Sequence, residues 1–594
     1  MSSYTAPIKD ILFVLNEIAG LNDVAALPGC EDATPDLVDA VIEEAGKLAS
    51  NVLAPLNHRG DIEGCKIDNG VVRTPKGFKE AYRQFVEGGW NGVPFDPQYG
   101  GQGLPWLVST AVSELWSSAN MAFSLCPMLT QGTVELLGTH GSEDLKEKYL
   151  EKLISGEWNG TMNLTEPQAG SDLAQIRSKA AKEDDHYRIS GQKVFITYGE
   201  HDMTDNIVHM VLARLEGAPE GIKGISLFLV PKFLVNEDGS FGERNDLRCV
   251  SIEHKLGINA SPTAVMAFGD NDGAVGYLIG QENQGIMCMF TMMNNARLGV
   301  GLQGVAIAER AYQQAREYAL ERVQSRDASC KNTDPVAIIH HPDVKRMLLS
   351  MKSRTEAARA LAYSAAAYLD TAKHHPDSEE RKRAQGQVDL MIPVVKAWST
   401  DIGIDAANIG VQVHGGMGYM EETGAAQHLR DARIASIYEG TNGIQAIDLV
   451  GRKVAREKGH SVAVLIEEIR RFQPDTSNPD MASISKRLET ATMELERATA
   501  WIVETFENDT NAVLSGAVSY LDLLGTTLGG WMMGRSAEIA LQKLEDGIGD
   551  PEFYKAKVVS ARFFADQVLV EAPSHSEKIV SGASSITTSI FYRP

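Results

Sequence analysis

Apolar residues recur three and four positions apart between residues 35 and 158, as in Val38, Val41, Ile42 and Ala45. This spacing predicts amphipathic helices, because such positions share one face of an α-helix. Prolines and glycines cluster between Pro94 and Pro105 and indicate a loop there. We therefore expect an N-terminal helical domain at residues 41–158, after an extension at residues 1–40.

The pattern changes after Gly160, where short runs of β-branched and aromatic residues alternate with turn sequences. These runs are Tyr187–Ile189, Lys193–Thr197, Asn206–Leu212 and Ile225–Val230. Asn236-Glu237-Asp238-Gly239 is a typical turn sequence. Strands of this length and spacing predict an antiparallel β domain, which we place at residues 159–282.

Helical periodicity returns at Gly285, with alanine-rich stretches at 356–372 and 394–407. Small residues allow helices to pack closely, which favours a four-helix bundle at residues 283–460. A polar stretch at 471–478 precedes more helical sequence, and we assign residues 461–594 to an additional helical domain. The predicted fold class is therefore multidomain α+β.

The net charge of -23 and the pI of about 5.1 disfavour nucleic acid and anionic membranes as partners. The most apolar window, 517–533, contains Asp522 and three glycines, so we expect no membrane span. The first 20 residues lack the pattern of a signal or transit peptide. Six scattered cysteines without a C-x-x-C pair indicate reduced thiols. These features together favour a cytoplasmic protein.

Two motifs suggest ligands that their surroundings do not support. Gly299–Gly304 matches G-x-G-x-x-G, but the sequence on both sides reads as helix, whereas a dinucleotide site needs a preceding strand. We expect these glycines to let two helices approach closely. The pairs His340-His341 and His374-His375 lack the spacing of a helical metal site, so we predict no metal.

Two other segments carry residues suited to catalysis. The first, Leu164 to Asp172 (L-T-E-P-Q-A-G-S-D), offers hydroxyls and backbone N–H groups that could hold a flavin or a pyrophosphate. By itself it could also be an ordinary loop in which Ser171 caps the next segment. The second, Ile437 to Gln445 (I-Y-E-G-T-N-G-I-Q), places Glu439 among apolar neighbours that could raise its pKa toward that of a general base. By itself Glu439 could also be a solvated carboxylate at a helix end.

Together, and in this domain order, the two segments resemble the signatures of the acyl-CoA dehydrogenase family. The resemblance covers about residues 41–453. It implies a FAD enzyme that oxidises the Cα–Cβ bond of an acyl-CoA to a trans-2-enoyl-CoA. Glu439 would remove the α-proton, while the β-hydrogen would leave as hydride to the flavin.

The resemblance also implies binding residues at matching positions. FAD would contact Met162, Leu164, Thr165, Ser171, Phe195, Ile196, Thr197 and Thr441. A neighbouring subunit's FAD would contact Arg322, Gln412, Gly415 and Gly416. The substrate would contact Ser171, Asn294, Arg297 and Gly440. Four places depart from the family: Phe195 stands where Trp or Tyr is usual, Asn294 where Asp is common, Gly443 where a Gln is expected, and residues 324–327 where an F-G-K run is frequent.

The extra length, 40 residues before and 141 after the shared region (594 minus 453), resembles a long bacterial subgroup of this family. That resemblance implies 3-(methylthio)propanoyl-CoA as substrate, in dimethylsulfoniopropionate breakdown. A dehydrogenase for straight-chain acyl-CoAs is the alternative. Electron-transferring flavoprotein would accept the electrons, whereas an oxidase would use O₂; a catalytically weak flavoprotein scaffold is a further alternative. The C-terminal helices would cover the surface that shorter relatives use to form tetramers, which predicts a homodimer.

Overall fold

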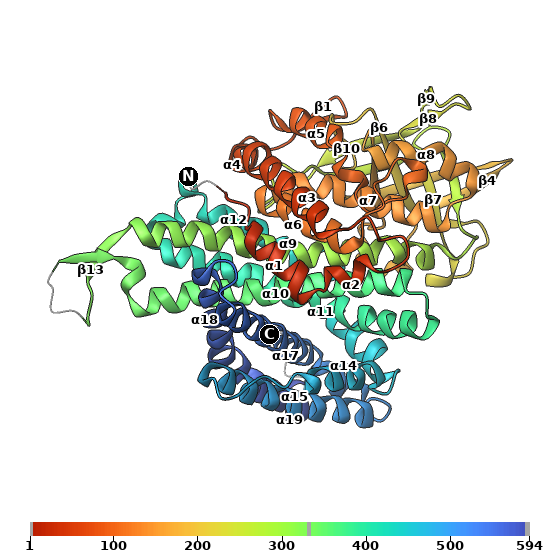
Figure 1. Ribbon diagram of the computed structural model, residues 1–594. Helices are drawn as coiled ribbons and strands as arrows, with labels where there is room; N and C mark the ends of the chain where they lie inside the picture. The colour runs from red at the N-terminus through yellow and green to blue at the C-terminus, as the bar shows by residue number, and fades with distance from the viewer. Residues whose placement is uncertain (1–3, 330–333, 588–594) are drawn as a thin grey trace, which may run out of the picture. The chain divides into compact units, whose positions relative to one another are not determined.

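The computed structural model describes residues 4–329 and 334–587, whose helices and strands are drawn in Figure 1. The chain divides into two compact units. The sheet unit comprises residues 44–104 and 115–299, and the helical unit comprises residues 1–43, 105–114 and 300–594. Three helices have residues in both units: α3 (Pro35–Leu48), α6 (Trp106–Ala119) and α9 (Gly285–Glu321). The five-part division of the chain expected from the sequence stays a prediction.

The sheet unit combines helices with most of the strands. Its other helical segments are η2 (Ala49–Leu53), α4 (Ala54–Glu63), α5 (Phe78–Glu87), η3 (Trp90–Gly92), η4 (Pro97–Tyr99), α7 (Met121–His140), α8 (Glu143–Ser155), η5 (Leu173–Gln175) and η6 (Ile222–Gly224). Its strands are β1 (Lys66–Asp68), β2 (Val71–Arg73), β3 (Trp158–Asn163), β4 (Lys179–Glu183), β5 (His186–Thr197), β6 (Asn206–Leu215), β7 (Ile225–Pro231), β8 (Phe233–Val235), β9 (Phe241–Arg244), β10 (Leu247–Ile252), β11 (Thr263–Phe268) and β12 (Ala274–Ile279).

The main sheet has the strand order β10-β11-β5-β12-β7-β6-β3, and β4 pairs with both β5 and β6. Most pairs are antiparallel, as expected, but β3 and β4 each run parallel to β6. Parallel pairing is possible there because these strands are not joined by hairpins, and long connections separate them. The two runs expected at 187–189 and 193–197 form the single strand β5, and the sequence did not predict the β1–β2 hairpin.

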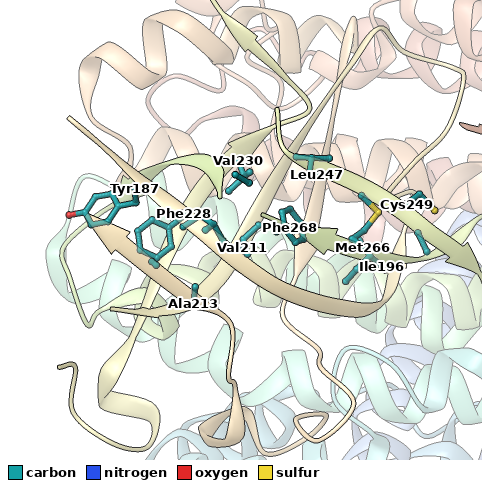
Figure 2. Close-up of a cluster of buried hydrophobic side chains, with 14 of the residues drawn as sticks. Tyr187, Ile196, Val211, Ala213, Phe228, Val230, Leu247, Cys249, Met266 and Phe268 are labelled. Carbon is teal, nitrogen blue, oxygen red and sulfur yellow. The ribbon is translucent and has the colours of Figure 1, made fainter. Parts of the chain in front are cut away.

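Buried apolar side chains of the sheet make a continuous core, part of which Figure 2 shows. Tyr187 and Phe228 pack with ring centroids 5.0 Å apart. Ile196, from the same strand as Tyr187, is buried in this cluster, and Val72 from β2 belongs to it as well. The alternation of β5 thus points some side chains into the core and leaves their neighbours outside.

The described part of the helical unit contains long helices and an antiparallel strand pair, β13 (Val323–Arg326) and β14 (Pro335–Ala337). Before the long helices lie α1 (Ile8–Phe13), η1 (Val14–Ile18) and α2 (Leu21–Ala25). The bundle and its connections are η7 (Ile338–His340), α10 (Pro342–His374), α11 (Ser378–His414), η8 (Gly415–Tyr419), η9 (Glu421–Thr423), α12 (Ala425–Ala432), η10 (Arg433–Ser436), α13 (Asn442–Asp448) and η11 (Leu449–Ala455). The C-terminal helices are α14 (His460–Arg471), α15 (Pro479–Thr505), α16 (Thr510–Ser515), α17 (Ala517–Glu545), α18 (Pro551–Gln567), η12 (Leu569–Glu571), α19 (Ala572–Ser581) and α20 (Ala583–Thr587).

Glycines determine how closely the central helices pack. A Cβ at Gly301 or Gly304 of α9 would lie 2.5 Å or less from a backbone oxygen of α11. The G-x-G-x-x-G run therefore lies inside a helix and serves close helix packing, which confirms the sequence interpretation. Likewise, a Cβ at Gly525 of α17 would lie 2.6 Å from the Trp398 ring of α11. The C-terminal helix α17 thus packs directly against α11.

Candidate active site

Glu439 lies in a short turn of the helical unit, between η10 and α13. Its φ is +54°, and that of Gly440 is +84°. A left-handed backbone is uncommon for a residue with a side chain, and such residues concentrate at functional sites. Glu439 is half-buried. It is therefore neither a core residue nor the fully solvated carboxylate of a frayed helix end.

Helix α11 holds the backbone of this turn. The fully buried Lys396 donates from Nζ to the carbonyl oxygen of Gly440 at 2.6 Å and to Oδ1 of Asn442 at 2.9 Å. Asn442 in turn donates from Nδ2 to Oδ1 of Asp401 at 2.8 Å. The buried Gln445 of α13 donates to the carbonyl oxygen of Glu439 at 3.1 Å. Successive carbonyls of the turn are therefore each held by a buried side chain.

The residue before Glu439 is fixed from α9. The Tyr438 hydroxyl donates to Oε1 of Gln303, which is 1% exposed. Burial raises the pKa of Tyr438, and the neighbouring Glu439 charge raises it further. Tyr438 is therefore neutral at physiological pH and acts as a hydrogen-bond donor. The turn is thus held on both sides of Glu439.

In the sheet unit, the loop after β3 is built around a buried ion pair. Nζ of Lys193 lies 2.8 Å from the Glu166 carboxylate and 3.1 Å from the carbonyl oxygen of Leu164. Glu166 also accepts from the backbone N–H groups of Arg177 and Ser178. Burial alone would raise the pKa of Glu166, but Lys193 and these donors hold it at about 2. Burial lowers the pKa of Lys193 to about 8, so the pair is charged at neutral pH.

This loop brings together the two flavin segments expected from the sequence. The backbone N–H of Val194 donates to the carbonyl oxygen of Thr165 at 3.0 Å. Phe195 is 62% exposed, with φ at +62°, while Thr165 and Thr197 are half-buried. The loop thus presents the aromatic side chain of Phe195 and two partly exposed threonines to a ligand.

The remaining candidates of the sheet unit differ in exposure. Met162 is half-buried, whereas Leu164 and Ile196 are buried. Ser171 is exposed and does not cap the next segment; the side chain of Asp172 caps η5 instead. Arg297 is buried and donates to Oδ1 of Asn294 at 3.4 Å.

The other candidates belong to the helical unit. Arg322 is exposed at the end of α9, where its guanidinium contacts the backbone oxygen of Val323 and the side chain of Gln324. Gln412 is exposed near the end of α11. Nothing lies within 4 Å of the position that a Cβ would take at Gly415 or Gly416. Thr441 caps α13 by accepting from the backbone N–H of Ile444 at 3.2 Å.

Sequence reasoning missed the residues that hold these candidates: Lys396, Gln303, Gln445, Glu166 and Lys193. A signal was present for Lys396, because it stands in an otherwise apolar and small run, Val394-Val395-Lys396-Ala397-Trp398. Lysines are almost never fully buried unless they are paired. A lysine on the apolar face of a predicted helix therefore marks a position with a specific partner.

Among the described residues, no group of three or more His, Cys, Asp or Glu side chains could hold a metal ion. No helix in the described ranges is long and apolar enough to cross a membrane. Cys30, Cys65, Cys126, Cys249 and Cys288 are free, and the sixth cysteine, Cys330, lies outside the described residues.

Family models match almost the whole chain. Residues 39–157, 161–270 and 283–454 match the N-terminal, middle and C-terminal domains of acyl-CoA dehydrogenase. Residues 465–589 match the acetyl-CoA dehydrogenase C-terminal like family. The chain belongs to the acyl-CoA dehydrogenase family. The family resemblance and the expected fold class are thus confirmed.

Full-length relatives of this acyl-CoA dehydrogenase include two curated proteins. The chain is 47% identical to 3-methylmercaptopropionyl-CoA dehydrogenase from Ruegeria pomeroyi, over 99% of both chains. It is 36% identical to a butyryl-CoA dehydrogenase from Syntrophomonas wolfei, over 96% of both chains. The solved structure of Caenorhabditis elegans ACDH-11 in complex with C11-CoA covers 98% of this chain at a TM-score of 0.79 and 20% identity, a likeness of fold; 96% of that chain is covered.

The enzyme is thus an acyl-CoA dehydrogenase, its substrate is an acyl-CoA, and its cofactor is FAD. The residues present fit that cofactor. In the sheet unit, the exposed Phe195 face beside two hydroxyls suits a planar, polar ring. In the helical unit, the open space beside Gly415 and Gly416 lets a phosphate approach the backbone closely.

Proposed function

We propose that this enzyme oxidises 3-(methylthio)propanoyl-CoA to 3-(methylthio)acryloyl-CoA, in dimethylsulfoniopropionate breakdown. The observation that carries the proposal is the 47% identity to the Ruegeria pomeroyi enzyme across 99% of both chains, including the N-terminal and C-terminal extensions. An identity that extends over the whole chain supports a shared substrate better than agreement in two motifs would.

In this reaction Glu439 is the base that removes the α-proton of the thioester. Its turn is held by Lys396 and Gln445 from behind, so the carboxylate reaches the substrate from a fixed backbone. The family resemblance assigns further substrate contacts to Gly440, Asn294, Arg297 and Ser171. When bound, FAD accepts the β-hydrogen with its electron pair. The protein orients the thioester and excludes water.

The sheet unit holds the flavin ring in this proposal. Thr165 and Thr197 would hydrogen-bond to it, and Phe195 would cover one of its faces. The backbone of Met162, Leu164 and Ile196 would line its edge. The ion pair of Glu166 with Lys193 keeps that loop in shape, because both groups are buried and charged.

An anaerobic visible spectrum of the purified holoenzyme tests the substrate. We expect 3-(methylthio)propanoyl-CoA to bleach the flavin band, with a faster single-turnover rate than butyryl-CoA gives at the same concentration. A spectrum that does not change with 3-(methylthio)propanoyl-CoA, or a clear preference for butyryl-CoA, would refute the proposed substrate. The second result would favour a straight-chain substrate, which the butyryl-CoA dehydrogenase relative also suggests.

We also propose that electron-transferring flavoprotein reoxidises the enzyme in the cytoplasm. Reoxidation by that flavoprotein should be fast, whereas air alone should produce little hydrogen peroxide. Stoichiometric peroxide formation in air would instead identify an oxidase.

We propose further that the enzyme is a homodimer in which Arg322, Gln412, Gly415 and Gly416 contact the FAD of the neighbouring subunit. Replacing Arg322 with alanine should weaken FAD retention by about tenfold or more, since a hydrogen bond to a charged group contributes about 1.5–3 kcal/mol. Flavin content after gel filtration measures this, with Arg326→Ala at the exposed end of the neighbouring strand β13 as control. Full occupancy in Arg322→Ala would contradict the contact, and a tetrameric mass would contradict the dimer.

A further inference from the structure

Lys396 is a buried cation that contacts the turn carrying the candidate base. Its side chain is fully buried in α11 and donates to the carbonyl oxygen of Gly440 and to Oδ1 of Asn442, and its charge interacts with the Asp401 carboxylate. Burying an ammonium group is costly unless hydrogen bonds and a nearby opposite charge compensate for it. A methionine would fill the same space without that cost. The presence of lysine therefore indicates a requirement beyond packing.

That requirement lies in the backbone of the turn. Both Glu439 and Gly440 have positive φ, a conformation that costs a residue with a side chain about 1–3 kcal/mol. The turn must therefore be held by its surroundings. Lys396 holds the carbonyl of Gly440, and Gln445 holds the carbonyl of Glu439. Since these carbonyls belong to the two peptide planes that come after Glu439, they set the direction of its Cα–Cβ bond.

Asn442 connects the same turn to α11 a second time. Its side-chain N–H₂ donates to the carbonyl of Ala397 at 3.1 Å, to Oγ1 of Thr400 at 3.1 Å and to Asp401 at 2.8 Å, while its oxygen accepts from Lys396. Lys396 thus contacts both ends of the segment 440–442. One side chain of α11 couples the backbone after Glu439 to the start of α13.

We propose that Lys396 is a positioning residue for α-proton abstraction, which acts by holding the Glu439–Gly440 turn in its left-handed conformation. The proposal rests on the proposed role of Glu439 as base. Without the ammonium group, the carboxylate samples other directions and meets the α-proton less often. The abstraction rate then falls while the affinity for thioester and FAD is kept.

The α-proton step can be measured alone with (methylthio)acetyl-CoA, in which sulfur occupies the β-position. This thioester has no β-hydrogen to transfer, so the holoenzyme can only remove an α-proton and return a deuteron from D₂O. Exchange at saturating thioester is followed by mass spectrometry, and the dissociation constant and flavin content are measured in parallel.

We expect Lys396→Met to lower the exchange rate about 10- to 100-fold, the size of loss that a small misplacement of a catalytic group produces. The dissociation constant and flavin content should match those of wild type. Lys396→Gln, which can still donate to one oxygen, should recover part of the rate. Lys453→Met is the matched control. Lys453 forms an ion pair with Asp389 of α11, at 2.8 Å, and that ion pair lies outside the turn at Glu439.

Exchange by Lys396→Met at the rate of the Lys453→Met control would overturn the proposal. So would a loss that only parallels a loss of flavin or of thioester affinity. If Lys396→Met does not fold, Lys396→Gln carries the test, because it can keep a donor to only one of the two oxygens, and exchange at the wild-type rate in that variant would overturn the proposal. Glu439→Gln distinguishes a failure of this proposal from a failure of the proposed base. Wild-type exchange in that variant would show that Glu439 is not the base.

Discussion

Replacing Glu439 with glutamine is expected to lower turnover about 10²- to 10⁴-fold, the usual contribution of a general base. Glutamine has nearly the same shape, so the turn and its contacts with Gln445 and Lys396 should persist. FAD content and thioester affinity should therefore match those of wild type. The neutral amide cannot accept the α-proton, so the thioester should bind without bleaching the flavin band.

Two measurements make this prediction specific to the base. Steady-state turnover and the anaerobic spectrum are compared for Glu439→Gln and for Glu422→Gln, an exposed glutamate in the same unit that should behave as wild type. Turnover by Glu439→Gln within the range of that control would show that another group removes the proton. A loss of flavin from Glu439→Gln would mean that the substitution disturbs the fold.

Replacing Arg359 with methionine is expected to destabilise the helical unit by about 3–5 kcal/mol, the cost of removing one partner from a buried ion pair. Arg359 of α10 is 1% exposed. Its guanidinium contacts Glu114 of α6 at 2.6 Å, Glu309 of α9 at 2.9 Å and Asp10 of α1. Four segments distant in sequence are thereby joined at one cation.

The cost arises from the carboxylates that would be left behind. Burial raises the pKa of Glu114, and Arg359 opposes that shift. Burial would lower the pKa of Arg359, but Glu114, Asp10 and Glu309 raise it well above its usual value. Without the arginine, Glu114 keeps the hydroxyl of Tyr363 at 2.7 Å but loses its bidentate cation. Protonating Glu114 or admitting water then costs free energy.

The urea midpoint of unfolding, followed by circular dichroism, measures the effect. The matched control is Arg383→Met: this arginine also contacts two carboxylates, of Glu380 and Glu468, but it is 43% exposed. Exposed pairs contribute about 0–1 kcal/mol. Adding Glu114→Gln to Arg359→Met should recover part of the loss, since it removes one of the unpaired charges. Equal midpoints for Arg359→Met and its control would contradict a structural role for the cluster.

Local sequence patterns predicted much of the fold correctly. The run 225–230 became β7, and the alanine-rich stretches became α10 and α11. The linker at 471–478 separates α14 from α15, which begins after an Asn478 cap. These features are readable because the period of apolar residues and the identity of turn and cap residues are local properties. The parallel pairing of β3 with β6 was not readable, because partners distant in sequence leave no local pattern.

The residues of the candidate site likewise include some that the sequence predicted and some that it did not. The segment around Glu439 could be found because its residue types recur across a family, and the G-x-G-x-x-G run could be rejected because its neighbours are helical. Lys396 was missed, because a lysine in a helix is usually solvated. Lys396 becomes a partner of Gly440, 44 positions away in sequence, only because the tertiary structure packs α11 against the turn.

By itself, then, the sequence determined the class and order of the elements, the family, and the candidate base, because periodicity and motifs are properties of contiguous residues. The tertiary structure alone decided which buried charges meet: Arg359 with Glu114, 245 positions apart, and Lys193 with Glu166. The reason is physical. A buried charge is stable only where chain segments from elsewhere bring its partner within hydrogen-bond distance, and that position depends on helix crossings and strand register.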